Sequence, residues 1–112
     1  MKITINDHRK IFAVQEEFSK FYPNLKIEFL SKPSKVGDAH SEKIIKETSK
    51  TLGECRVVHT KGELTLLHSM TVADLNQALS DTYGLSAMIL RKSGKQWIET
   101  TVNEQLGIEK QD

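Results

Sequence analysis

The stretch from Glu63 to Thr101 decides the fold, and it reads ELTLLHSMTVADLNQALSDTYGLSAMILRKSGKQWIETT. Leucines at alternating positions of residues 64–67 predict a strand whose one side is buried. Residues 87–90 and 96–101 predict two further strands, joined by a two-residue turn at Ser93–Gly94. An amphipathic helix separates the first of these strands from the second.

That helix has the clearest boundaries in the chain. Thr71 is a good N-terminal cap, and Asp74 three residues later approximates a capping box. Gly84 is the glycine expected where a helix ends in a left-handed residue. One helix face is apolar through Val72, Leu75, Leu79 and Tyr83.

The first thirty residues repeat the order strand, helix, strand more loosely. Asn6 and Asp7 predict the start of the helix, and Pro23 predicts its end. The first thirty residues align with the second half of the chain. The offset is 61 positions for residues before Pro23 and 60 positions for residues after it. The aligned pairs include Ile3 with Leu64, Ile11 with Val72, Phe18 with Leu79, Tyr22 with Tyr83 and Leu25 with Leu85. Most of them are apolar positions that any two amphipathic βαβ units would share, so an internal repeat and a coincidence of pattern both remain open.

Two βαβ units predict a single α+β domain over residues 1–112. We expect a ferredoxin-like antiparallel sheet with both helices on one face and an extra C-terminal hairpin strand. The expected strand order is fifth, fourth, first, third, second. A short middle helix is predicted over residues 51–59, with Gly62 as the left-handed residue that closes it. Residues 31–50 predict a long polar surface excursion, and residues 103–112 a polar tail.

The alternative is a different strand order in which the middle segment forms a layer of its own. In either case the sheet has a second side that the helices do not cover. We expect Leu90 to lie opposite Trp97 in the final hairpin and to share this side with Met88. An apolar patch of this kind usually marks an interface. The candidate interface comprises Met88, Leu90, Lys92, Lys95 and Trp97. The alternative, that the excursion or the tail covers the patch, also remains open.

The composition narrows the possible functions. The chain has 112 residues, 28% of them charged, and a formal net charge of +1. This balance does not favour a nucleic acid, for which we would expect a strongly basic domain. One cysteine permits no internal disulfide and suits the cytoplasm. No apolar run reaches transmembrane length, and the N-terminus does not resemble a secretory signal.

One group of residues could support chemistry. Cys55 and His59 would share a face of the predicted middle helix, and His68 follows in the next loop. A metal site or a thiol–imidazole pair would use such spacing. A lone cysteine is more often a small buried apolar residue, and we therefore predict a structural role for it and no metal or cofactor.

Three motifs together resemble a known family. TVADLNQALSDTYGL and RKSGKQWIETT, with TLGE upstream, are similar to segments of a family of small uncharacterised bacterial proteins. Members of that family carry a TVxELxxxFxxxYGL helix, an RKSG turn, a W-x-E-T-T strand and a T-D-D-W-T-L-x-x-Q tail. The tail of this chain, residues 102–106, lacks the second tryptophan. The resemblance implies no activity, cofactor or catalytic residue.

The sequence therefore favours a non-enzymatic module that associates with itself as a homodimer or binds another protein. A small-ligand or enzymatic site near Cys55 and His59, beneath the excursion, is the alternative. Nucleic-acid binding through Arg91, Lys92, Lys95, Trp97 and the lysines of residues 31–50 ranks third. The outward residues of the central strands are Thr4 and Thr65, which cannot stack on bases.

Overall fold

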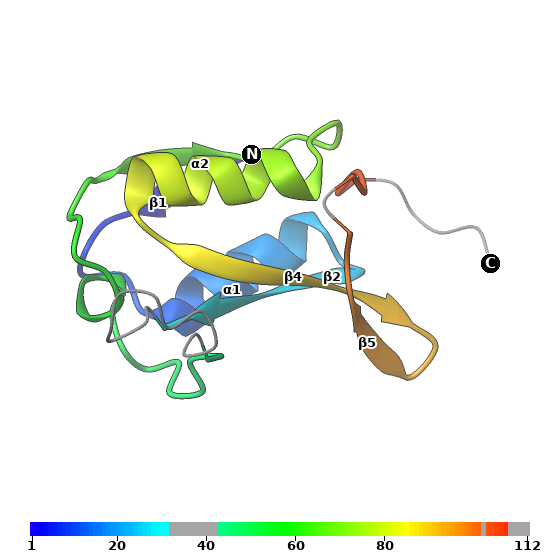
Figure 1. Ribbon diagram of the computed structural model, residues 1–112, viewed down its shortest axis with the longest axis horizontal. Helices are drawn as coiled ribbons and strands as arrows, with labels where there is room; N and C mark the ends of the chain where they lie inside the picture. The colour runs from blue at the N-terminus through cyan, green and yellow to red at the C-terminus, as the bar shows by residue number, and fades with distance from the viewer. Residues whose placement is uncertain (32–42, 102, 108–112) are drawn as a thin grey trace, which may run out of the picture.

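A computed structural model describes residues 1–31, 43–101 and 103–107 of the chain (Figure 1). It confirms a mixed α+β protein with two helices. The elements follow one another as β1 (Lys2–Ile5), α1 (Ile11–Phe21), β2 (Leu25–Leu30), the short 3-10 helix η1 (Leu52–Cys55), β3 (Gly62–Thr65), α2 (Val72–Tyr83), β4 (Ser86–Ser93) and β5 (Gln96–Glu99). Within the described ranges, no helix is long and apolar enough to cross a lipid bilayer.

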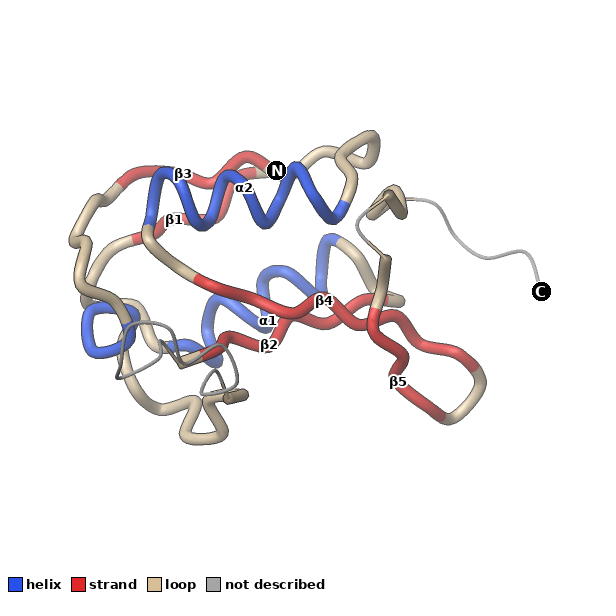
Figure 2. The backbone as a smooth tube through the Cα atoms, in the orientation of Figure 1, coloured by secondary structure: helices blue, strands red, loops and turns tan. Residues whose placement is uncertain are grey.

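The strands form two antiparallel sheets, and the expected single five-stranded sheet is wrong. β1 pairs with β3, as expected, but β4 pairs with β2 instead of β1, and β5 continues on the far side of β4 (Figure 2). Strand length gives the physical reason. β4 forms six residue pairs with the six-residue β2, which the four-residue β1 could not supply.

The core lies between the two sheets and the two helices. α1 packs against β2, and α2 packs against β4. Apolar residues at alternating positions of the strands, and Leu66 directly after β3, are buried, namely Ile3, Ile5, Ile27, Phe29, Leu64, Leu66 and Ile89. The period-two pattern of these strands thus identified their inner faces correctly, although it did not identify their neighbours.

The strand pairing has a local two-fold pattern. Ile3 lies opposite Leu64, the residue 61 positions later, and Glu28 lies opposite Met88, 60 positions later. The pairs on either side are exchanged, because Lys2 lies opposite Thr65 and Thr4 lies opposite Glu63. A two-fold axis through the Ile3–Leu64 pair produces this arrangement of β1 and β3.

The two helices begin differently. Thr71 caps α2 as predicted: its hydroxyl accepts from the Asp74 amide at 3.1 Å, and the Asp74 carboxylate accepts from the Thr71 amide at 3.0 Å. The predicted start of α1 is wrong, because the Asn6 side chain accepts from the amides of His8 and Arg9 in a turn that precedes the helix. α1 begins at Ile11 without a side-chain cap.

Glycine geometry confirms one prediction and corrects another. Gly84 ends α2 in the left-handed conformation, with a φ of 63°. Gly62 does not, because the described glycines with positive φ are Gly84 and Gly94. The middle helix is accordingly shorter than residues 51–59. It is the four-residue η1, and the chain is extended again at Arg56.

The C-terminal residues 104–107 are not the loose polar tail that we expected. Leu106 is 4% exposed and belongs to the core. This segment lies against the loop before α2, and residues 50–53 lie in the same way against the loop before α1. The amides of Val72, Leu106 and Gly107 donate to the carbonyls of Glu104, Met70 and His68, at 2.9, 2.8 and 3.1 Å. In the same way, the amides of Ile11, Leu52 and Gly53 donate to the carbonyls of Lys50, Arg9 and Asp7, at 2.9, 2.9 and 3.2 Å.

Part of the predicted excursion lies within the described chain. Ile44 forms an isolated bridge with Leu30, and the Ile45 amide donates to the Phe29 carbonyl at 2.8 Å. These contacts extend the edge of β2 at the only apolar pair of residues 31–50. Residues 32–42 of the excursion lie outside the described residues.

Candidate functional site

The outward side of the β2–β4–β5 sheet is the first candidate site, and we call it the open face. Its side chains alternate with the buried residues of β2 and β4. They are Lys26, Glu28, Leu30, Met88, Leu90, Lys92, Trp97 and Glu99. All of them are at least partly exposed within the described structure. The outward side of the other sheet, formed by β1 and β3, carries only polar residues in its paired part, including Thr4 and Thr65.

The hairpin register corrects the expected neighbours of Trp97. Ser93 pairs with Gln96, so the turn residues are Gly94 and Lys95, one position later than predicted. Trp97 therefore lies opposite Lys92, and Leu90 lies opposite Glu99. When the turn shifts by one residue, the residue opposite each position of β4 shifts by two. The predicted residues consequently stay on the same face, except Lys95, which lies in the turn.

Trp97 is the largest exposed side chain of the open face, with 41% of its surface accessible. The Lys26 ammonium lies 5.1 Å from the centre of the indole ring, in a cation–π arrangement. The same ammonium lies 3.8 Å from the Glu28 carboxylate. The open face thus combines an apolar strip with two lysines and two glutamates of opposite charge.

The cysteine–histidine hypothesis is not supported by the geometry. η1 ends at Cys55, so Cys55 and His59 do not share a helix face. His59 instead lies against Asp7, with 2.8 Å between its Nδ1 and a carboxylate oxygen. Burial raises the pKa of the Cys55 thiol, which disfavours the reactive thiolate. Among the described residues, no group of three potential metal ligands occurs.

The sequence did not predict the ion pair between Arg56 and Asp7, which lies beside the C-terminal end of α2. Arg56 is 5% exposed, and its guanidinium donates to Asp7 Oδ1 from Nη2 at 3.0 Å and from Nε at 3.2 Å. Its Nη1 donates to the Tyr83 carbonyl at 2.9 Å, at the C-terminal end of α2. The hydrogen bond with His59 holds the pKa of Asp7 below its usual value, and Arg56 contributes to the same shift. The only signal in the sequence was an arginine in a segment predicted to be amphipathic.

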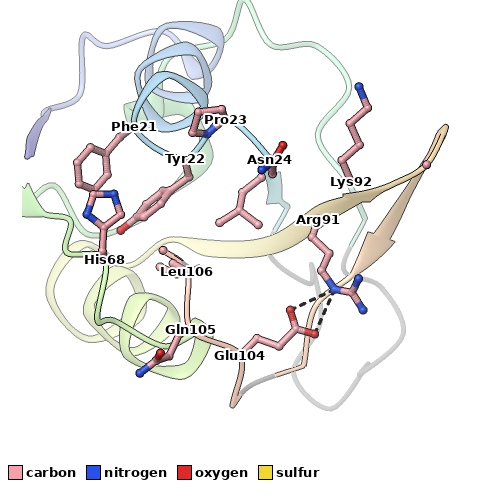
Figure 3. A pocket seen from close by; sticks show the side chains of 13 residues that line it. Phe21, Tyr22, Pro23, Asn24, His68, Arg91, Lys92, Glu104, Gln105 and Leu106 are labelled. Carbon is pink, nitrogen blue, oxygen red and sulfur yellow. Dashed lines mark hydrogen bonds and ion pairs between the residues drawn. The ribbon is translucent and has the colours of Figure 1, made fainter. Parts of the chain in front are cut away.

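A cavity at the opposite end is the second candidate site, and we call it the end cavity. It has a volume of about 470 Å³ and lies between the end of α1, β4 and residues 104–107 (Figure 3). Phe21 and His68 form one wall, with 4.6 Å between their ring centres. Leu106 lies between this wall and the pair formed by Arg91 and Glu104. The size is typical of a small-molecule site.

Tyr22 supports the aromatic wall but offers no base. Its hydroxyl donates to the Leu67 carbonyl at 2.7 Å. Burial raises its pKa to about 12, so the phenol stays protonated near neutral pH. From the sequence, Tyr22 was noted only as the residue aligned with Tyr83, because the residues that complete the cavity come from distant segments.

Arg91 is the charged group on the inner side of β4. Its Nε lies 3.3 Å from a Glu104 carboxylate oxygen. Among the described residues, its two terminal nitrogens have no hydrogen-bond partner. Lys92, the next residue, lies on the open face, and Figure 3 shows it pointing away from Arg91. The end cavity therefore offers a guanidinium and an imidazole near an apolar wall, an arrangement suited to binding and not to nucleophilic chemistry.

A smaller cavity of about 310 Å³ lies where the sequence predicted a ligand site near Cys55. Cys55, Arg56 and Ser31 line it, whereas His59 does not. Arg56 is already paired with Asp7 and Tyr83, and the other charged residues that line this cavity are Lys50 and Glu54.

No protein family, curated protein or solved structure compared with the chain matches it. A function must therefore be inferred from the open face and the end cavity themselves.

Proposed function

We propose that the chain is a non-enzymatic interaction module that forms a homodimer through the open face. The observation that carries the proposal is Trp97, 41% exposed on a strand at the edge of the β2–β4–β5 sheet. A large aromatic side chain gains much more from burial in an interface than from partial exposure. Leu90 and Met88 continue the apolar surface inward from Trp97.

The charges of the open face favour a second copy over other partners. Lys26 and Lys92 are balanced by Glu28 and Glu99 on the same face. In a two-fold dimer each lysine can face a glutamate of the other copy, because the same patch is used twice. A nucleic acid would instead select an uncompensated basic surface. The proposed dimer therefore uses an apolar centre with a self-complementary charged margin.

Sedimentation velocity over protein concentrations from micromolar to millimolar tests the proposal. We expect the wild type to shift from monomer to dimer, and Trp97→Glu to remain monomeric at concentrations where the wild type is dimeric. Val57→Glu is the matched control, because Val57 is 76% exposed and lies outside the open face. A wild type that stays monomeric throughout, or a Val57→Glu variant that loses the dimer equally, contradicts the proposal.

Intrinsic fluorescence gives a second readout. Trp97 is the only tryptophan of the chain, so its emission reports on this surface alone. We expect the emission maximum to move to shorter wavelength as the dimer forms, because the indole ring leaves water. An emission maximum that does not change while a dimer forms would place the dimer contact elsewhere and contradict the assignment to the open face.

We also propose that the two halves of the chain are copies of one βαβ unit, each followed by a short segment ending in Leu-Gly. The strand register and the matching hydrogen bonds of residues 50–53 and 104–107 support this interpretation. A cytoplasmic location suits the proposed module, because its single cysteine, Cys55, is free.

A further inference from the structure

We infer that the end cavity binds a small molecule that joins an aromatic ring to one anionic group, a phosphate or a carboxylate. The inference does not depend on the proposed dimer, because the lining residues of the cavity other than Lys92 lie outside the open face. The two ends of the molecule have the same backbone frame but different contents.

Residues 50–53 and 104–107 form this common frame. Each segment donates from a Leu amide and a Gly amide to the loop before a helix, and accepts from the first residue of that helix. Gly53 and Gly107 are both pressed against that loop: a Cβ on Gly53 would lie 2.8 Å from Asp7 Cβ, and one on Gly107 would overlap His68. Asp7 and His68 therefore occupy corresponding places, 61 positions apart.

The first end is occupied by a side chain of the protein itself. The Arg56 guanidinium lies between Asp7 and the carbonyl of Tyr83, the last residue of α2. Its positive charge is matched to the carboxylate of Asp7. This end therefore shows that the frame creates a place for a planar charged group beside a helix end.

At the second end, different residues occupy the positions that hold the positive charge of Arg56 at the first end. Under the offsets of 61 and 60, His68 takes the place of Asp7, and Arg91 takes the place of Ser31. The carboxylate of Glu104, the acidic residue of the end cavity, is already paired with Arg91 Nε. The terminal nitrogens of Arg91 keep their donors for a second acceptor, and a guanidinium binds phosphate and carboxylate oxygens through such paired donors. The sign of the preferred group is thus reversed between the two ends.

The apolar wall identifies the rest of the ligand. Phe21 and Tyr22 pack edge to face with 4.7 Å between ring centres, and Phe21 lies beside His68. Leu106 and Pro23 add apolar surface to the same cavity. A volume of about 470 Å³ exceeds what an inorganic anion alone would fill. A ring against this wall, with its anionic group at Arg91, uses both parts of the site.

Two-dimensional ¹H–¹⁵N NMR titration of the full chain tests the inference with phenyl phosphate, benzoate and the neutral benzyl alcohol. We expect the two anions to shift the amides of His68, Arg91 and Gly107 with saturation, and benzyl alcohol to bind at least about tenfold more weakly. The tighter of the two anions identifies the anionic group as phosphate or carboxylate. Absence of saturable shifts at these amides, or equal binding of benzyl alcohol, overturns the inference.

Matched variants separate binding from folding. Arg91→Gln should weaken binding of the tighter anion about tenfold, whereas Lys61→Gln, an exposed residue just before β3 that does not line the cavity, should leave it unchanged. Glu104→Gln should strengthen binding, because it removes the carboxylate that competes for Arg91. A purely structural role of the Arg91–Glu104 pair would instead make both Arg91→Gln and Glu104→Gln weaken binding, and that result overturns the inference.

A last variant tests whether the chain supplies its own occupant. The spacing that aligns Gly107 with Gly53 also aligns Lys110, which lies outside the described residues, with Arg56. The titration is therefore repeated on Lys110→Ala, with unchanged affinity as the expected result. An anion that binds this variant but not the wild type overturns the inference.

Discussion

Ile3 lies directly opposite Leu64 in the pairing of β1 with β3, and both side chains are buried. The two residues are also counterparts under the 61-residue offset, so the pair lies on the local two-fold axis of these strands. Glu28 and Met88, which lie opposite each other in the second sheet, are counterparts under the 60-residue offset. The pairing in each sheet thus contains a pair of counterparts, which is the arrangement that the proposed internal repeat predicts.

Leu106 tests whether the C-terminal segment belongs to the core. Leu106→Ala should lower the free energy of unfolding by about 3 kcal/mol, because it leaves a cavity among buried side chains. Urea unfolding followed by circular dichroism measures the change. Val57→Ala is the control and should change stability by less than about 0.5 kcal/mol, because Val57 is exposed. A Leu106→Ala variant as stable as this control would show that residues 104–107 do not pack as described.

Gly107 tests the close approach of the backbone to His68. Gly107→Ala should destabilise the protein by about 2 kcal/mol, because the added Cβ overlaps backbone and side-chain atoms of His68. Gly94→Ala is the comparison: nothing lies within 4 Å of its Cβ, and the positive φ alone should cost about 1 kcal/mol. Thermal unfolding should therefore show a lower melting temperature for Gly107→Ala than for Gly94→Ala. The reverse order would contradict the close approach of Gly107 to His68.

Asp7 gives the protein a defined response to acid. Its folded-state pKa lies below the ordinary value of 3.8, so the folded state binds fewer protons than the unfolded state. The resulting stabilisation is present above pH 3.8 and is lost as the pH falls through the folded-state pKa. The stability difference between the wild type and Asp7→Asn should shrink below pH 3.8 in urea titrations at successive pH values. Val57→Ala, an exposed substitution that changes no titratable group, is the control and should show no such trend.

Thr71 tests the contribution of the capping box to α2. Thr71→Ala should lower stability by about 1 kcal/mol, because the Asp74 amide loses its acceptor at the helix start. Ser80→Ala removes a hydroxyl from the exposed part of the same helix and should change stability by less than about 0.5 kcal/mol. Guanidinium unfolding of both variants measures the difference, and equal stability of the two would contradict the role of the cap.

The local signals of the sequence predicted α2 better than α1. Thr71 and Asp74 act on each other across three positions, and Gly84 acts on the helical turn directly before it, so these local signals predicted both ends of the helix. Asn6 is an equally good cap by residue type, but its side chain closes a turn before α1 instead. The backbone after Asn6 is held by Gly53 and Leu52, whose amides donate to Asp7 and Arg9. A contact from more than forty positions away thus decided where α1 begins.

The candidate sites divide in the same way. Alternation along β4 predicted that Met88, Leu90, Lys92 and Trp97 share a face, and the one-residue error in the turn did not change that face. The end cavity was not predictable, because Phe21, His68, Arg91 and Leu106 come from four separate segments. The residues of the Arg56–Asp7 pair are likewise 49 positions apart.

The sequence by itself determined the α+β class, the inner faces of the strands and the ends of α2, because these depend on periodicity and on contacts between near neighbours. The tertiary structure alone decided that β4 pairs with β2, that residues 104–107 complete the core, and that Arg56 pairs with Asp7 at one end of the molecule and Arg91 with Glu104 at the other. These features depend on strand lengths and on contacts between distant segments, whose free energies are set only when the whole chain is packed.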